Sequence, residues 1–588
     1  MLRPLRQPDQ ALPWLCVLVA AVLLACVPPP SVHGPPAKGS SPKLRPTQSA
    51  SAAPPATSEP ATVPAAHRFA VAAENPSAAA TAMQVLERGG SAVDAAIAGM
   101  LAAGVAQPVS SGLGGGGFAL CWSAKGQRAS FLDFRETAPG GIRPKHYEAR
   151  PLADRSRGKW VGVPGEVAGI EALHQRWGVL PLGELFRPAA QLARQGFVVS
   201  RHMHRALRWK RSWVERSPVY AAIFAPLGKL ATHGDQATNP ALAKTLERLA
   251  SEGPRAFYDG VVGRDVVATA RAAGSRIVRR DLQDYQVLER DPLAVRWGEH
   301  LVYTAPPPSA GGLMVAETLT MHGQDELTAT GYGSGAYLHL LAETFRGAVA
   351  DRIRAIGDPA FIKADVAALT SPARMRARRA KISLAATRSA ESFGLNESGT
   401  SQIVTVDEAG NVAVVTSSVN SMFGARLVTD GGFVLNDQLA AFTSKRLEQQ
   451  YRAGRQPNAA RAGARPVSSM TPTIVVRSAS PVLALGGSGG TRIPASVTQA
   501  LLARLAFGRT AQQCVSDVRI QAPAAGGLRI EAEADAALLA DLRRRGEVIE
   551  NRLPDYSAVQ LVTIGARDGA RLLEAASDPR KGGVAVVH

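Results

Sequence analysis

The sequence predicts a fold that mixes α-helices with antiparallel β-sheet. Two β-hairpins indicate the sheet: residues 400–416 and 472–485 each hold two runs of β-branched and apolar residues around a short polar turn. Helices are indicated by apolar residues at helical spacing, as at Val93, Ile97 and Leu101. Together these patterns predict the α+β class.

The first 26 residues have the pattern of an export signal. Arg3 and Arg6 precede an apolar run from Trp14 to Ala25, which is too short for a comfortable membrane span. The run ends in Leu-Leu-Ala-Cys, which resembles a bacterial lipobox, where Cys26 would be lipidated and become the mature N-terminus. An ordinary secretory signal and an uncleaved anchor are the alternatives. In each case we expect export to the periplasm or cell envelope.

Residues 27–66 are rich in Pro, Ser, Ala and Thr, so they hold too little apolar surface to offset the entropy of ordering. They predict a disordered linker between a membrane and the catalytic part. Residues 67–588 exceed what one hydrophobic core usually supports. Because their motifs are interleaved along the whole length, we expect two closely packed halves in one folded unit. Cys121 and Cys514 follow the leader, and the sequence leaves open whether they pair.

The charge balance is strongly basic, with 67 Lys and Arg against 48 Asp and Glu and a formal net charge of +19. Such a balance can indicate nucleic-acid binding. However, the chain has no zinc pattern, no basic helix with interleaved aromatics and only 5% aromatic residues. His202 and His204 are too closely spaced to suggest a structural zinc site, and their spacing favours an exposed polar turn or an exposed helix face. We therefore expect neither a nucleic-acid partner nor a metal or other cofactor. An arginine-rich coding background or contact with anionic envelope polymers accounts for the charge.

The first helices have recognisable start signals. Asn75-Pro76 suits the N-terminus of a helix, and we expect this helix to end at Gly89-Gly90. Ser91 with Asp94 three residues on predicts a capping box for the next helix. The run Gly114–Gly117 is no phosphate loop, because no Lys-Ser/Thr follows it. We expect these glycines to allow close backbone packing beside an active site.

Arg135 is a candidate for binding substrate. It follows the alternating strand Ser130–Phe134 and precedes a turn with a proline, so it lies at a strand end. A guanidinium there can hold a carboxylate in a two-pronged, charge-assisted pair. The alternative is a salt bridge with Asp133 or Glu136.

Thr400 opens the first hairpin, directly after Gly399. A threonine hydroxyl is a weak nucleophile until a base takes its proton, and one available base is the residue's own α-amine. That amine exists only after cleavage of the Gly399–Thr400 bond. Gly399 has no Cβ and so permits the tight geometry that such a cleavage needs. Alternatively, Thr400 merely opens a strand.

Seven short motifs follow one another from about Val71 to the C-terminus. They are Leu113–Phe118, Asp133–Glu136 with Ala138-Pro139, Pro306–Gly312, the segment around Thr400, Pro466–Met470, Gly489–Ile493 and Asp578–Gly583. In this order they are specific, and the chain resembles the gamma-glutamyltransferases, which are N-terminal nucleophile hydrolases. The resemblance implies a four-layer αββα sandwich, in which two mainly antiparallel sheets are covered by helices on both sides.

The resemblance also implies self-processing into a large subunit, 67–399, and a small subunit, 400–588, that begins with Thr400. The mature enzyme would cleave a gamma-glutamyl amide such as glutathione and pass the acyl group to water, an amino acid or a peptide. The implied catalytic residues besides Thr400 are Gly489 and Gly490, as the oxyanion hole, and Ser418, which orients the nucleophile. The implied substrate residues are Arg135, Ser468 and Ser469 for the α-carboxylate, and Asn420 and Gln438 for the amino end.

Several positions depart from the family pattern. Ala441 stands where an aspartate is expected to pair with the substrate's α-ammonium, and Asp437 could substitute for it only if it points the same way. Gln402 replaces a histidine, and Ser401 replaces a second threonine. These changes spare the acyl-transfer residues and affect substrate recognition.

Two other functions are therefore weighed. One is an amidohydrolase like the glutaryl or cephalosporin acylases, which would take a dicarboxylic acyl group without the amine. The other is a surface lipoprotein that binds without catalysis, but it predicts loss of Thr400, Gly489 or Gly490, and all three are present. The stretch Phe442–Pro466 is either a lid over the pocket or a disordered loop.

Overall fold

The structure is a computed structural model of the chain, and it describes residues 66–143, 157–387, 399–443, 456–523, 527–552 and 557–588. The residues from Val63 to His588 form one compact unit, as the interleaved motifs predict. The leader with Cys26, nearly all of the predicted linker and residues 444–455 of the predicted lid lie outside the described residues.

The first sheet has seven strands in the order β18-β1-β9-β10-β2-β3-β6, and all of its pairs are antiparallel. The hairpin predicted over 400–416 forms its centre, where Val412 pairs with Val406. The strands are β1 (Ala70–Ala73), β2 (Gly116–Ser123), β3 (Arg128–Phe134), β6 (Leu288–Arg290), β9 (Ser401–Val406), β10 (Val412–Ser418) and β18 (Val584–Val587).

The second sheet has six antiparallel strands in the order β17-β16-β12-β11-β8-β7. It contains the second predicted hairpin, β11 with β12. Its strands are β7 (Leu293–Trp297), β8 (His300–Thr304), β11 (Thr473–Arg477), β12 (Ser480–Ser488), β16 (Ala558–Arg567) and β17 (Ala570–Ser577). The strands of two smaller sheets are β4 (Phe197–Val198), β5 (Gln236–Ala237), β13 (Ile520–Gln521), β14 (Leu528–Ile530) and β15 (Ile549–Arg552).

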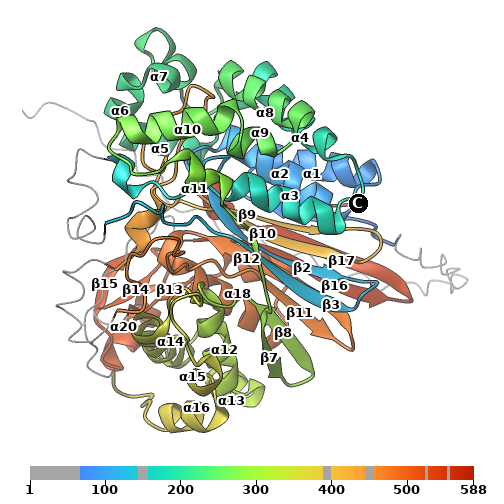
Figure 1. The fold of residues 1–588 in the computed structure, drawn as a ribbon. Helices are drawn as coiled ribbons and strands as arrows, with labels where there is room; N and C mark the ends of the chain where they lie inside the picture. The colour runs from blue at the N-terminus through green and yellow to red at the C-terminus, as the bar shows by residue number, and fades with distance from the viewer. Residues whose placement is uncertain (1–65, 144–156, 388–398, 444–455, 524–526, 553–556) are drawn as a thin grey trace, which may run out of the picture. The chain divides into compact units, whose positions relative to one another are not determined.

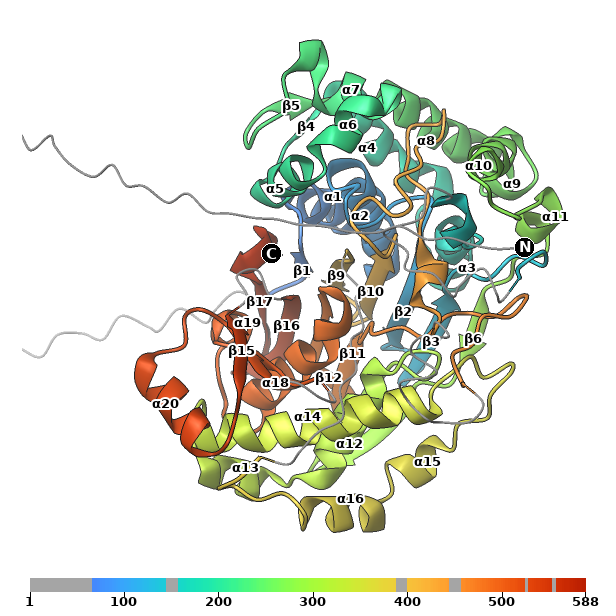
Figure 2. The same ribbon diagram turned by 90° about the vertical axis from the view of Figure 1, so that its left-hand side faces the viewer.

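Helices cover the outer face of each sheet, so the fold is the predicted αββα sandwich (Figures 1 and 2). Over the first sheet lie α1 (Pro76–Glu87), α2 (Ala92–Ala106), α3 (Glu166–Trp177), α4 (Leu182–Gln195), α5 (Arg201–Trp209), α6 (Arg211–Arg216), α7 (Pro218–Phe224), α8 (Pro240–Glu252), α9 (Arg255–Tyr258), α10 (Val261–Ala272) and α11 (Arg279–Gln283). The second sheet's side holds α12 (Gly311–Met321), α13 (Gln324–Thr330), α14 (Gly335–Ala355), α15 (Val366–Leu369), α16 (Pro372–Arg379), α18 (Ile493–Leu505), α19 (Ala511–Ser516) and α20 (Ala536–Arg544). The short 3-10 turns are η3 (Arg157–Trp160), η4 (Pro226–Gly228), η5 (Gln438–Ala441), η6 (Gly490–Arg492) and η7 (Pro579–Lys581).

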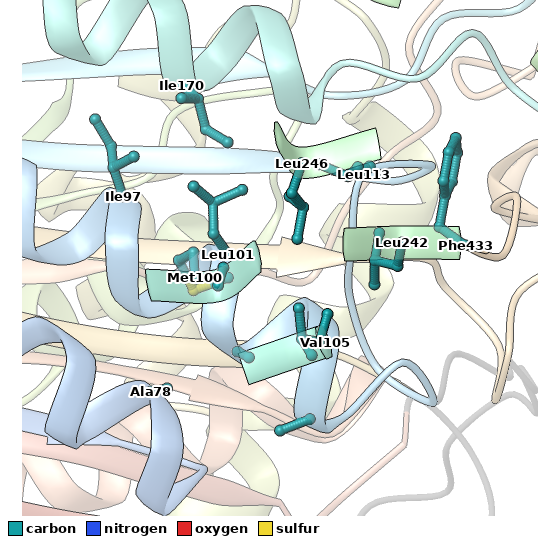
Figure 3. Packing of buried hydrophobic residues seen from close by; sticks show 14 of the residues in the cluster. Ala78, Ile97, Met100, Leu101, Val105, Leu113, Ile170, Leu242, Leu246 and Phe433 are labelled. Atoms are coloured by element: carbon teal, nitrogen blue, oxygen red, sulfur yellow. The ribbon is translucent and has the colours of Figure 1, made fainter. Parts of the chain in front are cut away.

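Three apolar layers separate the four layers of secondary structure. The central layer lies between the sheets and includes Phe118 and Val414 from the first sheet and Ile474 from the second. A larger layer joins the first sheet to its helices, where Leu101 of α2 and Leu246 of α8 lie close together (Figure 3). The third layer joins the second sheet to α12, α14 and α18. Burial of this apolar surface is the main force that holds the layers together.

The start signals of the first helices are confirmed. Asn75 Oδ1 accepts hydrogen bonds from the backbone N–H of Ser77, at 2.9 Å, and of Ala78. Ser91 and Asp94 form the predicted capping box at the start of α2. Val93, Ile97 and Leu101 of α2 are buried, as their spacing predicts.

The glycine run at the start of β2 allows close backbone contact, as predicted. A Cβ added at Gly115 would lie 2.3 Å from Ser418 O, and one at Gly117 would lie 1.9 Å from Thr416 O. Any side chain there would push β2 away from β10. The run thus keeps the end of β10, and Ser418 with it, close to β2.

The structure shows the burial and position of the two cysteines and of the two neighbouring histidines. Cys121 and Cys514 are buried and unpaired, which settles the question that the sequence left open. His202 and His204 lie on α5, as one of the predicted alternatives has it. However, His202 is half-buried and its Nδ1 is shielded from solvent, and this burial lowers its pKa to about 3.

Candidate active site

Thr400 lies at the start of β9 with its hydroxyl on the carbonyl group that precedes it. The side chain is only 3% exposed, and Thr400 Oγ1 is 2.6 Å from Gly399 O. Ser418, the last residue of β10, donates a short hydrogen bond to the same oxygen, and its Oγ lies 3.5 Å from Thr400 Oγ1. Two hydroxyls therefore converge on the carbonyl that self-cleavage would attack.

Gly399 adopts a conformation that only glycine adopts easily. Its φ is 115°, and an added Cβ would lie 2.7 Å from Asn420 O. A side chain at this position would therefore be strained and would also clash. This is the tight geometry that the sequence suggests for the bond before Thr400.

Gly489 and Gly490 connect β12 to η6 and α18. Both have positive φ angles, 121° and 65°. Lys581 Nζ links this segment to the nucleophile, because it contacts Ser488 Oγ and lies 3.5 Å from Thr400 O. Backbone N–H groups at such a turn can stabilise negative charge on a tetrahedral oxygen.

Arg135 contacts the two residues that precede Ser468 and Ser469. Its guanidinium donates to Pro466 O and to Val467 O, both at 3.2 Å. The alternative salt bridge with Asp133 is not the reason for its position, since the Asp133 carboxylate pairs with other arginines and only accepts the backbone N–H of Arg135. The Ser469 hydroxyl accepts a hydrogen bond from Arg352 of α14.

Asn420 and Gln438 lie in two adjoining turns. Asn420 Nδ2 donates to Asp437 Oδ1 at 3.0 Å, and Asn420 N donates to Ser418 Oγ at 2.8 Å. Gln438 is 1% exposed, and its Oε1 has no hydrogen-bond partner within the described part of the chain. An unused buried acceptor is costly, and a ligand with an N–H donor would satisfy it.

Glu136 is a candidate for binding a cationic group, and the sequence analysis did not identify it. Its carboxylate is fully buried, and neither oxygen has a hydrogen-bond partner among the residues described. Burial raises the pKa of Glu136 to about 7, against the opposing effect of Arg135. A buried carboxyl beside Arg135 and Asp437 is suited to binding a cation, while the sequence analysis considered it only as a partner for Arg135. Its only sequence signal is its place directly after Arg135.

Two further residues beside Thr400 were also missed. Lys581 Nζ lies 3.4 Å from Glu74 Oε2 as well as beside the Thr400 carbonyl. Glu74 is 2% exposed, and burial raises its pKa to about 7. Both residues are more than 170 positions away from Thr400 in the chain. Lys581 lies within the last of the seven motifs, which was the one available signal.

The two substitutions that follow the nucleophile have structural roles. Gln402 accepts a hydrogen bond from Thr416 at 2.6 Å and donates to Ile403 O at 2.9 Å. The Ser401 hydroxyl accepts a hydrogen bond from Ser111 at 2.8 Å. Both side chains are therefore satisfied inside the protein, and neither enters the group formed by Thr400, Ser418 and Asn420.

The αββα fold, together with a threonine hydroxyl on the preceding carbonyl at the start of a central strand, defines the class of the N-terminal nucleophile hydrolases. The family model described as Gamma-glutamyltranspeptidase matches residues 78–588. A glutathione hydrolase proenzyme of Pseudomonas aeruginosa is 34% identical over 538 residues, which cover 88% of this chain and 94% of that protein. The chain belongs to the gamma-glutamyltranspeptidase family and is an enzyme of that family.

Acylases are also among the similar proteins. The acylase ACY 1 proenzyme of a Pseudomonas species is 33% identical over 473 residues, or 77% of this chain and 82% of that protein. The crystal structure of a cephalosporin acylase from Bacillus halodurans superposes with a TM-score of 0.78 at 23% identity, covering 90% of this chain and 99% of that one. The superposition confirms the fold.

Proposed function

We propose that this chain cleaves itself between Gly399 and Thr400 and then transfers gamma-glutamyl groups from amides such as glutathione. The observation that carries the proposal is the pair of hydroxyls, from Thr400 and Ser418, on the Gly399 carbonyl oxygen. The products would be a large subunit, 67–399, and a small subunit, 400–588.

Self-cleavage would proceed in two steps. The Thr400 hydroxyl adds to the Gly399 carbonyl carbon, while Ser418 stabilises the charge that develops on the oxygen. The C–N bond then breaks and the nitrogen takes up the proton that the hydroxyl has lost, which leaves an ester at Thr400 Oγ1 and a free α-amine on Thr400. Water hydrolyses the ester and releases the Gly399 carboxylate. The free amine is the base that the mature nucleophile needs.

In the mature enzyme, Thr400 would attack the gamma-glutamyl amide with its own amine as base. The backbone N–H groups of Gly489 and Gly490 would hold the oxyanion, and loss of one such donor typically costs about a hundred- to a thousandfold in rate. The substrate residues are Arg135, Ser468 and Ser469 for the α-carboxylate, and Asn420 and Gln438 for the amine. Water or an amine then takes the acyl group from Thr400.

The first experiment is intact mass with N-terminal sequencing of the purified protein, beside a Thr400→Ala variant. We expect two chains from the natural sequence, one of which begins at Thr400, and a single chain from the variant. A natural protein that stays whole under native conditions would contradict the proposal, because the free amine would never form.

A second candidate is an acylase that takes a dicarboxylic acyl group without the amine. It is favoured by Ala441 at the end of η5, where the family pattern has an aspartate. Against it, Glu136 and Gln438 Oε1 offer unused acceptors for an ammonium group. The rates at which the enzyme hydrolyses gamma-glutamyl-4-nitroanilide and glutaryl-4-nitroanilide distinguish the two candidates.

An Ala441→Asp variant should lower the KM for the gamma-glutamyl donor about tenfold or more, since a charged hydrogen bond contributes roughly 1.5–3 kcal/mol.

We further propose that Cys26 carries a lipid and that residues 27–66 tether the enzyme to the envelope. The lipobox-like sequence before Cys26 and the composition of the linker support this. No helix in the described part of the chain is long and apolar enough to cross a bilayer. A Cys26→Ala variant should move from the membrane fraction to the soluble fraction. Equal distribution of the two proteins would contradict lipidation.

A further inference from the structure

Three positively charged side chains from segments far apart in the sequence interact electrostatically with Asp437. The turn η3 packs against η5, which begins directly after Asp437. Arg157 begins η3, Lys210 lies between α5 and α6, and Arg426 belongs to the loop between β10 and η5. The Trp213 indole on α6 donates to Arg426 O at 2.9 Å, so α6 lies beside that loop (Figure 1). We call Arg157, Lys210 and Arg426 the cationic cluster.

None of the three charged groups forms a hydrogen bond or ion pair with any residue that the structure describes, and Arg157 Nη1 is buried without a partner. The three side chains are half-buried. Arg465, by comparison, is buried and pairs with Asp133 at 2.5 Å. The cluster therefore has no carboxylate of its own within hydrogen-bond distance in the described part of the chain, and an anion from outside could pair with it.

The three groups also repel one another. Burial lowers the pKa of Lys210, and the charges of Arg426 and Arg157 lower it further. The pKa of Arg157 is lowered by burial and by Arg426, and Asp437 opposes the effect in both residues. However, Asp437 is one carboxylate beside three cations, and its Oδ1 already accepts hydrogen bonds from Asn420 and Ser421. The cluster therefore keeps a net positive charge.

The cluster borders the catalytic group. Asp437 holds Asn420, whose N–H donates to Ser418 Oγ. Ser418 Oγ in turn lies 3.5 Å from Thr400 Oγ1. A substrate bound at Thr400 is therefore only a few side chains away from the three cations.

We propose that the cationic cluster is a subsite for a carboxylate on the amine half of the substrate, so that the enzyme prefers acidic leaving groups and acidic acceptors. The inference rests on the proposed function. The carboxylate of the acyl half already has Arg135, Ser468 and Ser469, which leaves the cluster for the other half. Leaving and accepting amines use the same acyl intermediate, so one subsite serves both. The ligand class is an amino acid or peptide with at least one carboxylate.

The test compares two substrates that differ by one carboxylate: gamma-glutamyl-4-nitroanilide and gamma-glutamyl-3-carboxy-4-nitroanilide. The natural enzyme should prefer the carboxylated anilide in kcat/KM. Arg426→Met and Lys210→Met should each lower this preference about tenfold, mainly through KM. The matched control is Arg296→Gln on the outer strand β7, an exposed position where the same loss of charge should leave the preference unchanged. Because Arg426 also attracts the buried Asp437 carboxylate, Lys210→Met decides the outcome if Arg426→Met does not fold.

The outcomes separate this inference from the proposed function. If the neutral anilide is turned over and the preference is the same in all variants, the subsite is wrong while the enzyme activity stands. If neither anilide is turned over, the proposed function fails. Calorimetry of the purified natural protein with a Glu-Glu dipeptide and an Ala-Ala dipeptide then decides on the subsite. Tighter binding of Glu-Glu that is lost in Arg426→Met supports it, and equal binding of the two dipeptides overturns it.

Discussion

At the scale of single residues, the bond before Thr400 shows how two hydroxyls can prepare a peptide group for cleavage. In the proposed cleavage, Thr400 would supply the nucleophile, and Ser418 would supply a donor to the oxygen that becomes negative. Ser418 also accepts the N–H of Asn420, which fixes the direction in which its own proton points. The geometry thus assigns different tasks to two chemically similar side chains.

We expect Ser418→Ala to slow self-cleavage about a hundredfold, because it removes one donor to the developing oxyanion. The measurement is the time course with which the 400–588 fragment appears after synthesis of the precursor. Ser418→Thr keeps the hydroxyl and should cleave at nearly the natural rate. Cleavage of the alanine variant at the natural rate would show that Ser418 is not needed for the reaction.

Some site residues were predictable from their neighbours in the sequence and others were not. Thr400, Arg135, Gly489 and Gly490 belong to short motifs, and the structure brings each to a position that suits its implied role. Glu136 is a candidate because its carboxylate is completely buried and has no hydrogen-bond partner among the described residues, and no local sequence pattern predicts this.

At the scale of elements, Asp94 connects the start of α2 to the turn between α3 and α4. Its Oδ2 accepts the backbone N–H of Ser91 at 3.0 Å, of Val179 at 2.8 Å and of Leu180 at 3.2 Å. The side chain is fully buried. The capping box was predictable from the sequence, whereas the two bonds to the distant turn were not.

We expect Asp94→Ala to lower the free energy of unfolding by about 2–4 kcal/mol, because the N-cap and the turn lose a shared acceptor. Urea unfolding followed by circular dichroism measures the loss. Asp94→Asn keeps one acceptor oxygen and should lose less than the alanine variant. Equal midpoints for Asp94→Ala and the natural protein would show that water replaces these bonds without cost.

At the scale of the whole molecule, strands from both sides of Thr400 are interleaved in both sheets. β1, β2, β3 and β6 share the first sheet with β9, β10 and β18, and β7 and β8 share the second with four later strands. Cleavage before Thr400 therefore breaks one peptide bond but no strand pairing. The two halves depend on each other for their cores.

After cleavage, we expect the two subunits to elute together in gel filtration under native conditions and to separate only in denaturant. The hydrogen-bonded strands and the shared apolar layers hold them together. Denaturing electrophoresis of the same fractions should show two bands. Elution of the subunits in separate peaks without denaturant would contradict the interleaved sheets.

Buried carboxyls should make the stability of the whole molecule fall as the pH rises. Burial raises the pKa of Glu166 to about 8, and its Oε2 accepts a hydrogen bond from Ser417 at 2.7 Å. The folded protein therefore holds a proton that the unfolded chain releases near its ordinary pKa. Stability falls between about pH 4.5 and pH 8, by at most about 1.4 kcal/mol per pH unit for this group.

Glu166→Gln should flatten this dependence, since an amide stays neutral at every pH. Unfolding midpoints in urea at pH 5, 6, 7 and 8 measure the slope for both proteins. Glu74 and Glu136, whose pKa values burial raises to about 7, should keep part of the slope in the variant. Identical slopes for the two proteins would show that Glu166 is ionised in the folded state.

The helix caps, both hairpins and the candidate nucleophile could be predicted from the sequence, because each depends on residues close together in the chain. The packed structure was needed to show that Gln402 is satisfied inside the protein, that Glu136 is buried without a hydrogen-bond partner among the described residues and that Lys581 lies beside Thr400. It also decided that Arg157, Lys210 and Arg426 lie close together. The physical reason is that burial and electrostatic interaction depend on distances in space, and the fold sets these between segments that are hundreds of residues apart.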